Sequence, residues 1–424
     1  MTSQLTLTEH LKKNKTIISN WLAEKEADGL MPFYTSVDVR DSGFKIAAVD
    51  TNLFPAGFNN LCQPHDPRVL AALKTTILKR VPNCKSILFI SEEHTRNGWY
   101  LENVRILNRM IQEAGFQVKT ASFLTEDTVP CTETNSIELE TATGHKIQVF
   151  CLHNILNKVA EEHHLYDLII LNNDLTEGIP KILKETNIPI YPSIQAGWHS
   201  RLKSHHFTKA NQLIEELGKL IDIDPWLMSC LFKTSQDVDI NDEADRQHLF
   251  KLATDLFNEI QQKYNEHHIT EKPLIFLKAD QGTYGMGVMP IESPEEILTL
   301  NRKDRNKLHK GKGSKLIEKF ILQEGVPSIS EIDHKASETC IYQIANEFVG
   351  GFYRVNSEKN GRENLNSKGM SFETICLPSK LQECEGKYEK NIDLYQILAR
   401  IAGIAAQKEI HELENSGILA NEKV

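Results

Sequence analysis

The sequence lacks the long apolar runs and the basic surplus that mark membrane and nucleic-acid-binding proteins. No segment approaches the ~18 consecutive apolar residues of a membrane span, and the N-terminal stretch MTSQLTLTEHLKKNK has no apolar core of signal-peptide length. The formal net charge is −10, whereas a nucleic-acid-binding face needs cations to neutralise phosphates. These absences predict a cytoplasmic protein that binds neither membranes nor nucleic acids.

The cysteines are equally uninformative as a pattern. There are eight, with no CxxC and no series of close pairs. The spacing therefore predicts neither a zinc site nor a disulfide framework. We expect reduced, structural thiols, as in a cytosolic protein.

Three common catalytic and nucleotide-binding motifs are missing as well. No GxGxxG follows the first α/β strand, no GK[ST] closes a phosphate loop, and no GxSxG marks a nucleophile. A dinucleotide-binding domain, a Walker-type NTPase and a serine hydrolase thus have little support.

What remains has the composition of an ordinary α/β protein. A chain of 424 residues is long enough for two or three domains. A helix is expected over residues 8–27, and from Lys85 short apolar strands alternate with amphipathic helices, which indicates a parallel sheet. Residues 208–265 are predicted to be mainly helical. We expect three parts, at 1–83, 84–200 and 201–424.

The first part contains a candidate metal site. The runs FYTSVDVR and FKIAAVDTN flank Asp41-Ser42-Gly43, which predicts a β-hairpin. By period-2 alternation Asp38 and Asp50 face a common side, near strand ends. Together with Asn52 they offer the carboxylate and amide oxygens that Mg²⁺ takes in proteins.

A glycine-rich hairpin in the third part is a candidate phosphate-binding loop. PLIFLKADQGTYGMGV reads as a strand ending at Lys278, a loop with Gly282, Gly285 and Gly287, and a second strand. Glycines let backbone N–H groups converge on phosphate oxygens, and the lysine adds a charge. A plain turn is the alternative interpretation.

The segments that follow have the order expected of a nucleotide site. KLIEKFILQEG is a short strand running into a polar bend, where Glu318, Phe320 and Glu324 would form a hinge for adenine and ribose. Further on, Arg354 and Arg362 are cations for a phosphoryl or acyl-phosphate oxygen, and Asn364 is an uncharged donor. Taken singly, either arginine could be an ordinary surface residue.

In this order the motifs resemble the ATP-grasp ligases, and glutathione synthetase most closely, over residues 272–370. The resemblance implies a Gly-rich loop that closes over ATP and an arginine, Arg354, that stabilises an acyl phosphate. That family expects its metal-binding hairpin after this region. Here a helix from Leu394 follows instead. We therefore hypothesise a circular permutation, with the hairpin of Asp38, Asp50 and Asn52 moved to the front.

Longer stretches, such as EEHTRNGWYLENVRILNRMIQEAGF and KADQGTYGMGVM, resemble the proteobacterial type of glutamate–cysteine ligase. This resemblance implies ATP- and Mg²⁺-dependent joining of the L-glutamate γ-carboxylate to the L-cysteine amine, the first step of glutathione synthesis. It also implies a second ATP-binding lysine and a substrate pocket. The candidates are Lys203 or Lys209 for the lysine, and Asn59, Asn60 and Arg96 for the substrates.

Other interpretations stay open at this point. One is glutathione synthetase, or another ligase of the same fold with a different acceptor amine; another is a non-catalytic ATP-binding regulatory module. The basic run from Arg302 to Lys315 is expected to be a solvated loop, although it could serve a nucleic-acid-associated ligase. A homo-oligomer is compatible with the sequence, which leaves the oligomeric state open.

Overall fold

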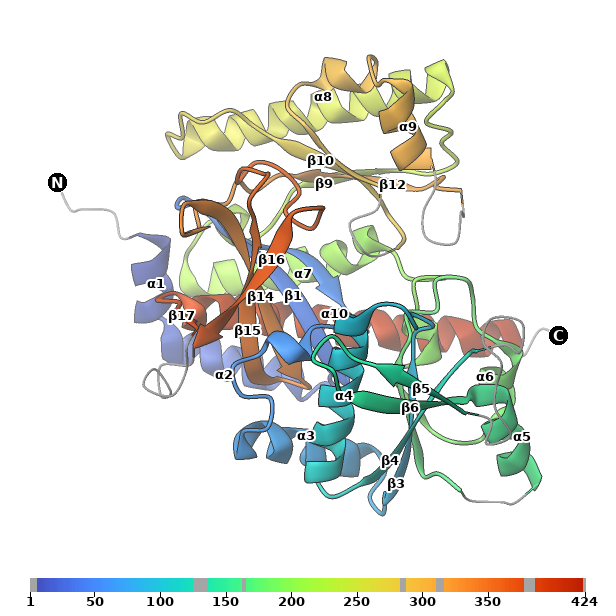
Figure 1. Ribbon diagram of the computed structural model, residues 1–424. Helices are drawn as coiled ribbons and strands as arrows, with labels where there is room; N and C mark the ends of the chain where they lie inside the picture. Colours follow the sequence, from blue (N-terminus) through green and yellow to red (C-terminus); the bar gives the residue numbers. More distant parts are fainter. Residues whose placement is uncertain are drawn as a thin grey trace.

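The computed structural model describes residues 6–124, 136–161, 165–282, 287–309, 316–376 and 386–421. Three β-sheets follow one another from top to bottom of Figure 1, with four, seven and six strands. Helices pack against all three, which confirms the predicted α/β class. Among the described residues, no helix has the length and apolar character needed to cross a membrane.

The predicted N-terminal helix is in fact two, α1 (Leu7–Lys13) and α2 (Lys15–Glu26). The break falls at Asn14, whose side-chain amide donates to the carbonyl of His10. An asparagine that bonds its own helix backbone in this way competes with helix continuation, which explains why the expected single helix is interrupted.

The seven-stranded sheet begins with the predicted hairpin, β1 (Tyr34–Asp41) and β2 (Ile46–Asn52). β1 pairs on its other side with β14, about 300 positions later in the chain, so the N-terminal hairpin completes a sheet built by C-terminal strands. The order is β17-β16-β15-β14-β1-β2, with β13 also on β14. These strands are β13 (Glu331–Ile332), β14 (Lys335–Ile344), β15 (Glu347–Asn356), β16 (Met370–Cys376) and β17 (Lys387–Tyr388).

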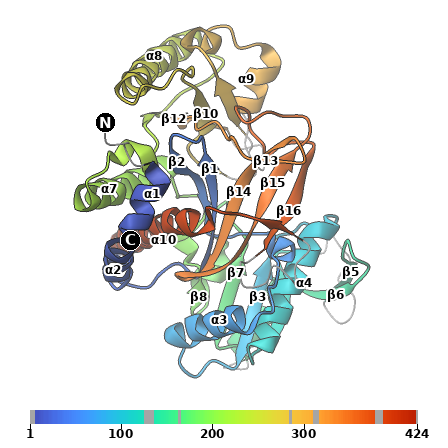
Figure 2. The same cartoon turned by 90° about the vertical axis from the view of Figure 1, so that its left-hand side faces the viewer.

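Both faces of this central sheet are covered, because alternate residues of β14 enter different cores. Ile341 packs with α2, α7 (Lys203–Ile221) and α10 (Ile392–Asn421), whereas Tyr342 packs toward α3 (Pro67–Arg80) and α4 (Gly98–Glu113). Figure 2 shows α1, α2, α7 and α10 gathered on one side of β14.

The six-stranded sheet confirms the predicted parallel layer. Its order is β5-β6-β4-β3-β7-β8, and all neighbours are parallel except β5 and β6. Helices α3 and α4 cover one face, and α5 and α6 cover the other. The elements are β3 (Ser86–Ser91), β4 (Gln117–Ser122), β5 (Ser136–Glu140), β6 (Lys146–Cys151), β7 (Leu168–Asn172), β8 (Ile190–Tyr191), α5 (Leu152–Glu161) and α6 (Lys181–Glu185).

The four-stranded antiparallel sheet has the order β11-β10-β12-β9. The predicted strand–loop–strand is the pair β10 (Ile275–Ala279) and β11 (Val288–Ile291), followed by β12 (Phe320–Glu324). β9 (Phe232–Ser235) lies in the stretch expected to be mainly helical, between α7 and α8 (Glu243–Glu266). Because β9 has only four residues and pairs at the sheet edge, no sequence period could reveal it.

The basic run from Arg302 is not wholly a loop. Residues Arg302–His309 form α9, in which Leu308 is buried in the core of the four-stranded sheet. The side chain of Asn301 accepts from the backbone N–H of Asp304 and caps the helix. The cap and the buried Leu308 therefore stabilise a helix in spite of the polar composition. The rest of the run, 310–315, lies outside the described residues.

Candidate active site

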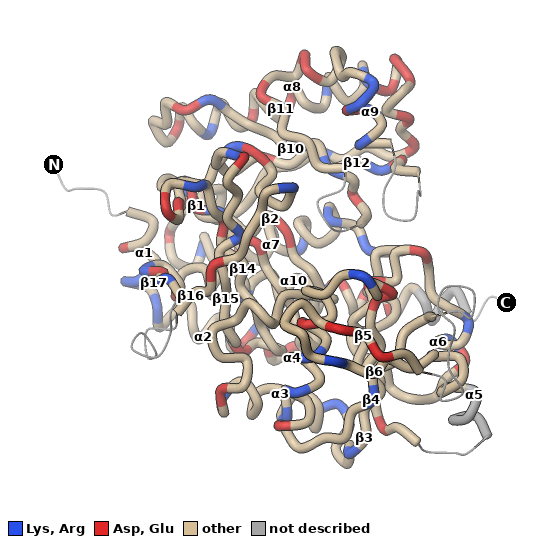
Figure 3. The backbone as a smooth tube through the Cα atoms, viewed as in Figure 1, with Lys and Arg blue, Asp and Glu red and all other residues tan. Residues whose placement is uncertain are grey.

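A pocket lies between the open face of the four-stranded sheet and the edge of the central sheet that carries β1 and β2. Three strands of the small sheet, β10, β11 and β12, meet four strands of the central sheet, β1, β2, β14 and β15, around it. Its lining is Asp38, Arg40, Val49, Asp50, Lys203, Phe276, Lys278, Gly282, Val288, Gln323, Glu324, Val326, Glu338, Arg354, Asn364 and Asn366. Charged residues of both signs dominate the lining that the central sheet provides. Figure 3 shows where Lys and Arg (blue) and Asp and Glu (red) lie along the backbone.

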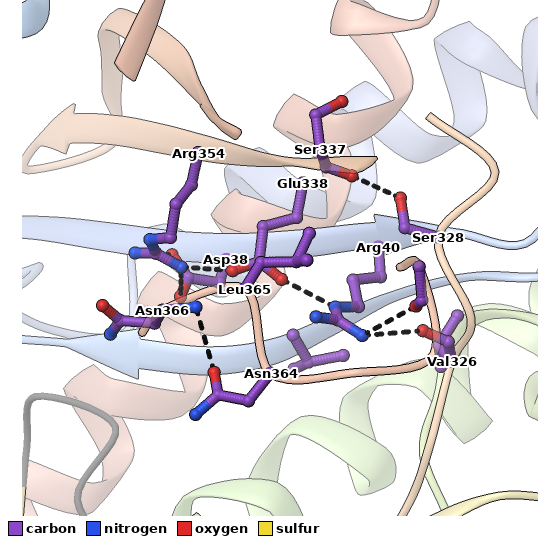
Figure 4. A network of polar contacts seen from close by, with 12 residues as sticks. Asp38, Arg40, Val326, Ser328, Ser337, Glu338, Arg354, Asn364, Leu365 and Asn366 are labelled. Atoms are coloured by element: carbon purple, nitrogen blue, oxygen red, sulfur yellow. Dashed lines mark hydrogen bonds and ion pairs between the residues drawn. The ribbon is translucent and has the colours of Figure 1, made fainter. Parts of the chain in front are cut away.

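Two carboxylates and two guanidiniums alternate along one wall of this pocket (Figure 4). Arg354 donates to Oδ2 of Asp38 at 2.7 Å and also to Glu338. Nε of Arg40 donates to Oε2 of Glu338 at 2.6 Å. Strand register causes this arrangement, because Glu338 and Arg354 are direct partners across β14 and β15.

The pKa directions in this network follow from burial and the facing charges. Burial raises the pKa of Asp38, in spite of the Arg354 guanidinium beside it. Burial alone would raise that of Glu338 too, but Arg40 and Arg354 outweigh it and hold its pKa below the ordinary value. Nε of Arg354 is buried without a partner, so one donor of this guanidinium is available for an incoming oxygen.

Two lysines face Asp50 across the pocket. Nζ of Lys203 lies 2.8 Å from Oδ1 of Asp50. Nζ of Lys278 donates to Oε1 of Gln323 at 2.6 Å and to the carbonyl of Val49 at 3.2 Å. Burial lowers the pKa of Lys278 to about 8. The two lysines offset the burial of Asp50 and hold its pKa well below the usual range, although water reaches this side chain, which is 41% exposed.

Gln323 presents an unused donor to the same pocket. A lysine ammonium only donates, so the amide oxygen of Gln323 must face Lys278. Its amide nitrogen is then buried without a partner. A buried donor without a partner lowers stability until an acceptor binds it. The wall of the pocket formed by the small sheet is therefore suited to an acceptor-rich ligand.

The glycine-rich loop begins at this wall. Gly282 has φ +105°, and a Cβ there would meet nothing within 4 Å, so glycine is required by the backbone conformation and not by crowding. Gly287 has φ +65° at the other end, and Gly285 lies outside the described residues. Before the loop, Asp280 accepts hydrogen bonds from the backbone N–H and hydroxyl of Ser204, which fastens the loop base to the start of α7.

The residues predicted to form an adenine hinge are dispersed. Glu318 is exposed, and its backbone carbonyl accepts from Val238. Phe320 is fully buried in the core behind the small sheet. Glu324 borders the pocket, but its carboxylate is paired with Lys45 at 2.8 Å and accepts from the indole of Trp226.

Of the remaining predicted residues, Lys203, Asn364 and Arg354 lie in the pocket and the others do not. Arg362 pairs with Glu292 and with backbone carbonyls, and Lys209 pairs with Glu412. The amide oxygen of Asn52 accepts from Phe54. The residues outside the pocket lining are Arg362, Lys209, Asn52, Asn59, Asn60 and Arg96.

The sequence-based candidates omitted four charged or polar lining residues, Arg40, Gln323, Glu338 and Asn366, and the apolar ones, Val49, Phe276, Val288 and Val326. Arg40 stands two positions after Asp38 on β1 and so shares its face, a signal that was present. No sequence signal identifies Glu338, because only the pairing of β14 with β15 brings it beside Arg354.

The donor set fits a magnesium ion that arrives with phosphates. Asp38 and Asp50 are direct partners across β1 and β2 and therefore face the same side. Among the residues described, no three His, Cys, Asp or Glu side chains are grouped to hold a metal by themselves. Mg²⁺ is commonly bound by one or two carboxylates plus substrate phosphates, which two facing aspartates in a lysine-rich pocket provide.

The thiols depart from expectation at two positions. Cys84, Cys230 and Cys340 are free thiols, but Cys151 and Cys376 each take part in a disulfide bond. Disulfides need Cα atoms about 4.4–6.8 Å apart. The fold sets that distance, so the sequence spacing could not show it.

The family model for glutamate-cysteine ligase (GshA) matches residues 8–410. Among solved structures, the chain is similar to a protein from Methylobacillus flagellatus KT provisionally named gamma-glutamylcysteine synthetase, with 34% identity, 96% of each chain covered and a TM-score of 0.84. The D-alanyl-alanine synthetase A of Vibrio cholerae is 12% identical, over 76% of this chain and 81% of that one, with a TM-score of 0.35. A glutathione synthetase-like effector of Globodera pallida is 9% identical, over 86% and 78%, with a TM-score of 0.34. The last two scores are too low to carry an argument. No curated protein matches the chain.

Proposed function

This chain belongs to the glutamate–cysteine ligase family, and from that premise we propose that its pocket uses MgATP to activate the γ-carboxylate of L-glutamate for attack by the amine of L-cysteine. The ligase class follows from the family. The use of ATP and Mg²⁺, the acyl-phosphate route and the role of each residue are our proposals. The observation that carries them is one pocket that combines facing aspartates, two lysines and an arginine with a free donor.

In the proposed reaction, a γ-carboxylate oxygen attacks the γ-phosphorus of ATP and the bond to the bridging oxygen breaks, releasing ADP. The cysteine amine then attacks the acyl carbon, loses a proton, and phosphate leaves. Mg²⁺ would neutralise phosphate charge during the first transfer. No protein nucleophile is required, which agrees with the absence of a GxSxG motif.

Lys278 and Lys203 would bind the phosphates; both line the pocket together with Gly282 of the glycine-rich loop. Arg354 would stabilise negative charge on the acyl phosphate through its unpaired Nε. Asp38 and Asp50 would hold the metal. In the structure as described these two carboxylates are paired with Arg354 and Lys203. The metal would bind beside the Asp38–Arg354 pair, and the phosphates would bind the lysine that faces Asp50.

We also retain the circular permutation and the division at 1–83, 84–200 and 201–424 as proposals. The pairing of β1 with β14 supports the permutation, because the N-terminal hairpin stands at the edge where a C-terminal hairpin would complete the sheet. A cytoplasmic location and a homo-oligomeric state are further proposals of the same kind.

The test is ADP release from the purified protein with MgATP, omitting glutamate and cysteine in turn, with mass detection of the product. Release that needs both amino acids and yields γ-glutamylcysteine is the expected result. ADP release that instead requires γ-glutamylcysteine and glycine would show the activity of a glutathione synthetase. No release with any amino-acid pair would favour a regulatory ATP-binding module.

A further inference from the structure

A buried ion pair lies just behind the pocket and belongs to none of the groups discussed so far. Nε of Arg201 lies 2.9 Å from Oε1 of Glu409 on α10, and the two side chains are 1% and 0% exposed. Burial would raise the pKa of Glu409, but Arg201 and His206 hold it at about 2, so the carboxylate is ionised. Neither residue lines the pocket.

Arg201 also grips the strand that carries the aspartate of the site. Its Nη1 donates to the backbone carbonyl of Thr51 at 2.6 Å. Thr51 stands directly after Asp50, so this bond fixes the backbone at the end of β2. A guanidinium can hold a carboxylate with one edge and a carbonyl with another because its five donors lie in one rigid plane.

The same segment sets the position of Lys203. The ring of Trp198 lies 4.7 Å from the Arg201 guanidinium and 4.3 Å from Nζ of Lys203. The backbone N–H of Lys203 donates to the carbonyl of Asp280 at the base of the glycine-rich loop, at 2.8 Å. Arg201 is therefore connected to the C-terminal helix on one side, and to Asp50 and Lys203 on the other.

Stability alone is a weak reason for such a pair, because desolvation of two charges offsets much of their attraction. Its placement supplies another reason. We infer that Arg201 and Glu409 are positioning residues, which hold the Asp50 strand and the Lys203 segment at the separation that MgATP requires. This inference rests on the proposed function of the pocket.

The chain offers a matched control on the same two helices. Glu412, one turn further along α10, pairs with His205 and Lys209 of α7 but is 47% exposed and lies away from the pocket. Glu409→Gln and Glu412→Gln therefore remove the same charge from the same helix pair, once behind the site and once at the surface.

We expect Glu409→Gln to lower kcat on the order of 100-fold and to raise KM for MgATP several-fold, with KM for glutamate and cysteine little changed. Glu412→Gln should stay within about twofold of wild type on every parameter. A merely structural role would lower the melting temperature and the active fraction, and leave KM and kcat per active site as they are. That outcome would overturn the inference.

If Glu409→Gln does not fold, Arg201→Lys takes its place. Lysine keeps the charge facing Glu409, but it lacks the planar fork needed to reach the Thr51 carbonyl as well. A folded Arg201→Lys enzyme with wild-type kcat and KM would contradict the positioning role. The affinity for MgADP, measured by calorimetry, should fall with the same variants. If the wild-type chain bound MgADP but had no ligase activity, the proposed function would be wrong. The MgADP affinities of wild type and variants would still test the positioning role.

Discussion

Nη1 of Arg354 donates a hydrogen bond to Oδ2 of Asp38 at 2.7 Å, so the proposed acyl-phosphate arginine is held by the proposed metal ligand. The two residues come from β15 and β1, which are separated only by β14. The arginine is thus fixed in place before any substrate arrives, which is the preorganisation that charge stabilisation in a transition state requires.

Replacement of this arginine should be costly even when the charge is kept. Arg354→Lys should lower kcat by about 100-fold or more, because lysine cannot bond Asp38, Glu338 and a substrate oxygen together. Arg362→Lys is the control, since Arg362 pairs with Glu292 outside the pocket lining, and should change kcat less than about threefold. Steady-state kinetics of ADP release measures both. Equal losses would return Arg362 to the catalytic group.

The metal proposal depends on Asp50. Asp50→Asn should lower turnover and raise the Mg²⁺ concentration for half-maximal activity by about tenfold or more, because one of the two facing carboxylates is gone. Titration of activity against Mg²⁺ checks this. Asp41→Asn is the matched control at the turn end of the same hairpin, where Asp41 accepts from Gly43 and Tyr395. If turnover and Mg²⁺ dependence were untouched in Asp50→Asn, the permuted metal site would be wrong.

The sequence determines only part of the arrangement around Asp38 and Asp50. The hairpin itself was available from the sequence, but its turn alone would set Asp38 opposite Val49. A register shift between Asp38 and Val39 brings Asp50 opposite Asp38 instead. The contacts of these aspartates with Arg354 and Lys203 were not available from the sequence either. They join elements that are distant in the chain, and no local period encodes such contacts.

In the segment predicted to form the adenine hinge, too, the sequence showed the strand but not the contacts of its side chains. The short strand of KLIEKFILQEG was predictable, since β12 is apolar and bounded by polar residues. The direction of each side chain was not. Phe320 lies in the core and Glu324 pairs with Lys45. The pairing of β12 with β9 and β10 determines which face of the sheet each side chain occupies.

Nucleotide affinity should depend on pH through Lys278. The burial of this lysine lowers its pKa to about 8, so the ammonium that binds phosphate is lost as the pH rises through about 8. Calorimetric affinity for MgADP should weaken between pH 7 and 9 in wild type. It should be nearly flat in Lys278→Arg, whose guanidinium stays charged. A flat wild-type profile would remove Lys278 from the phosphate site.

The same shift has a consequence for folding. The folded-state pKa lies below the ordinary value of 10.5, so between about pH 8 and 10.5 the unfolded chain binds more protons at this position. By linkage, the contribution of Lys278 to the free energy of unfolding rises with pH across that window. The buried charge is therefore destabilising near neutral pH, as expected for a group retained for ligand binding.

Variants of Glu324 can distinguish a structural role of this residue from a role in binding ribose. It forms a buried ion pair with Lys45, at 0% and 1% exposure, and accepts from Trp226 and from the backbone of Leu231. Glu324→Gln would leave the Lys45 charge buried without its partner, a loss of about 3–5 kcal/mol in comparable pairs. We expect the apparent melting temperature to fall by about 5 °C or more, and KM for ATP to change less than about threefold.

The double variant Lys45→Met/Glu324→Leu decides between these roles. Since it removes both charges and replaces them with apolar groups, it should recover much of the melting temperature that Glu324→Gln loses. Its KM for ATP should stay near the wild-type value if the pair only joins the hairpin to the small sheet. A stable double variant with KM raised tenfold would instead show that Glu324 binds the nucleotide, and that the contact with Lys45 is exchanged when ATP enters.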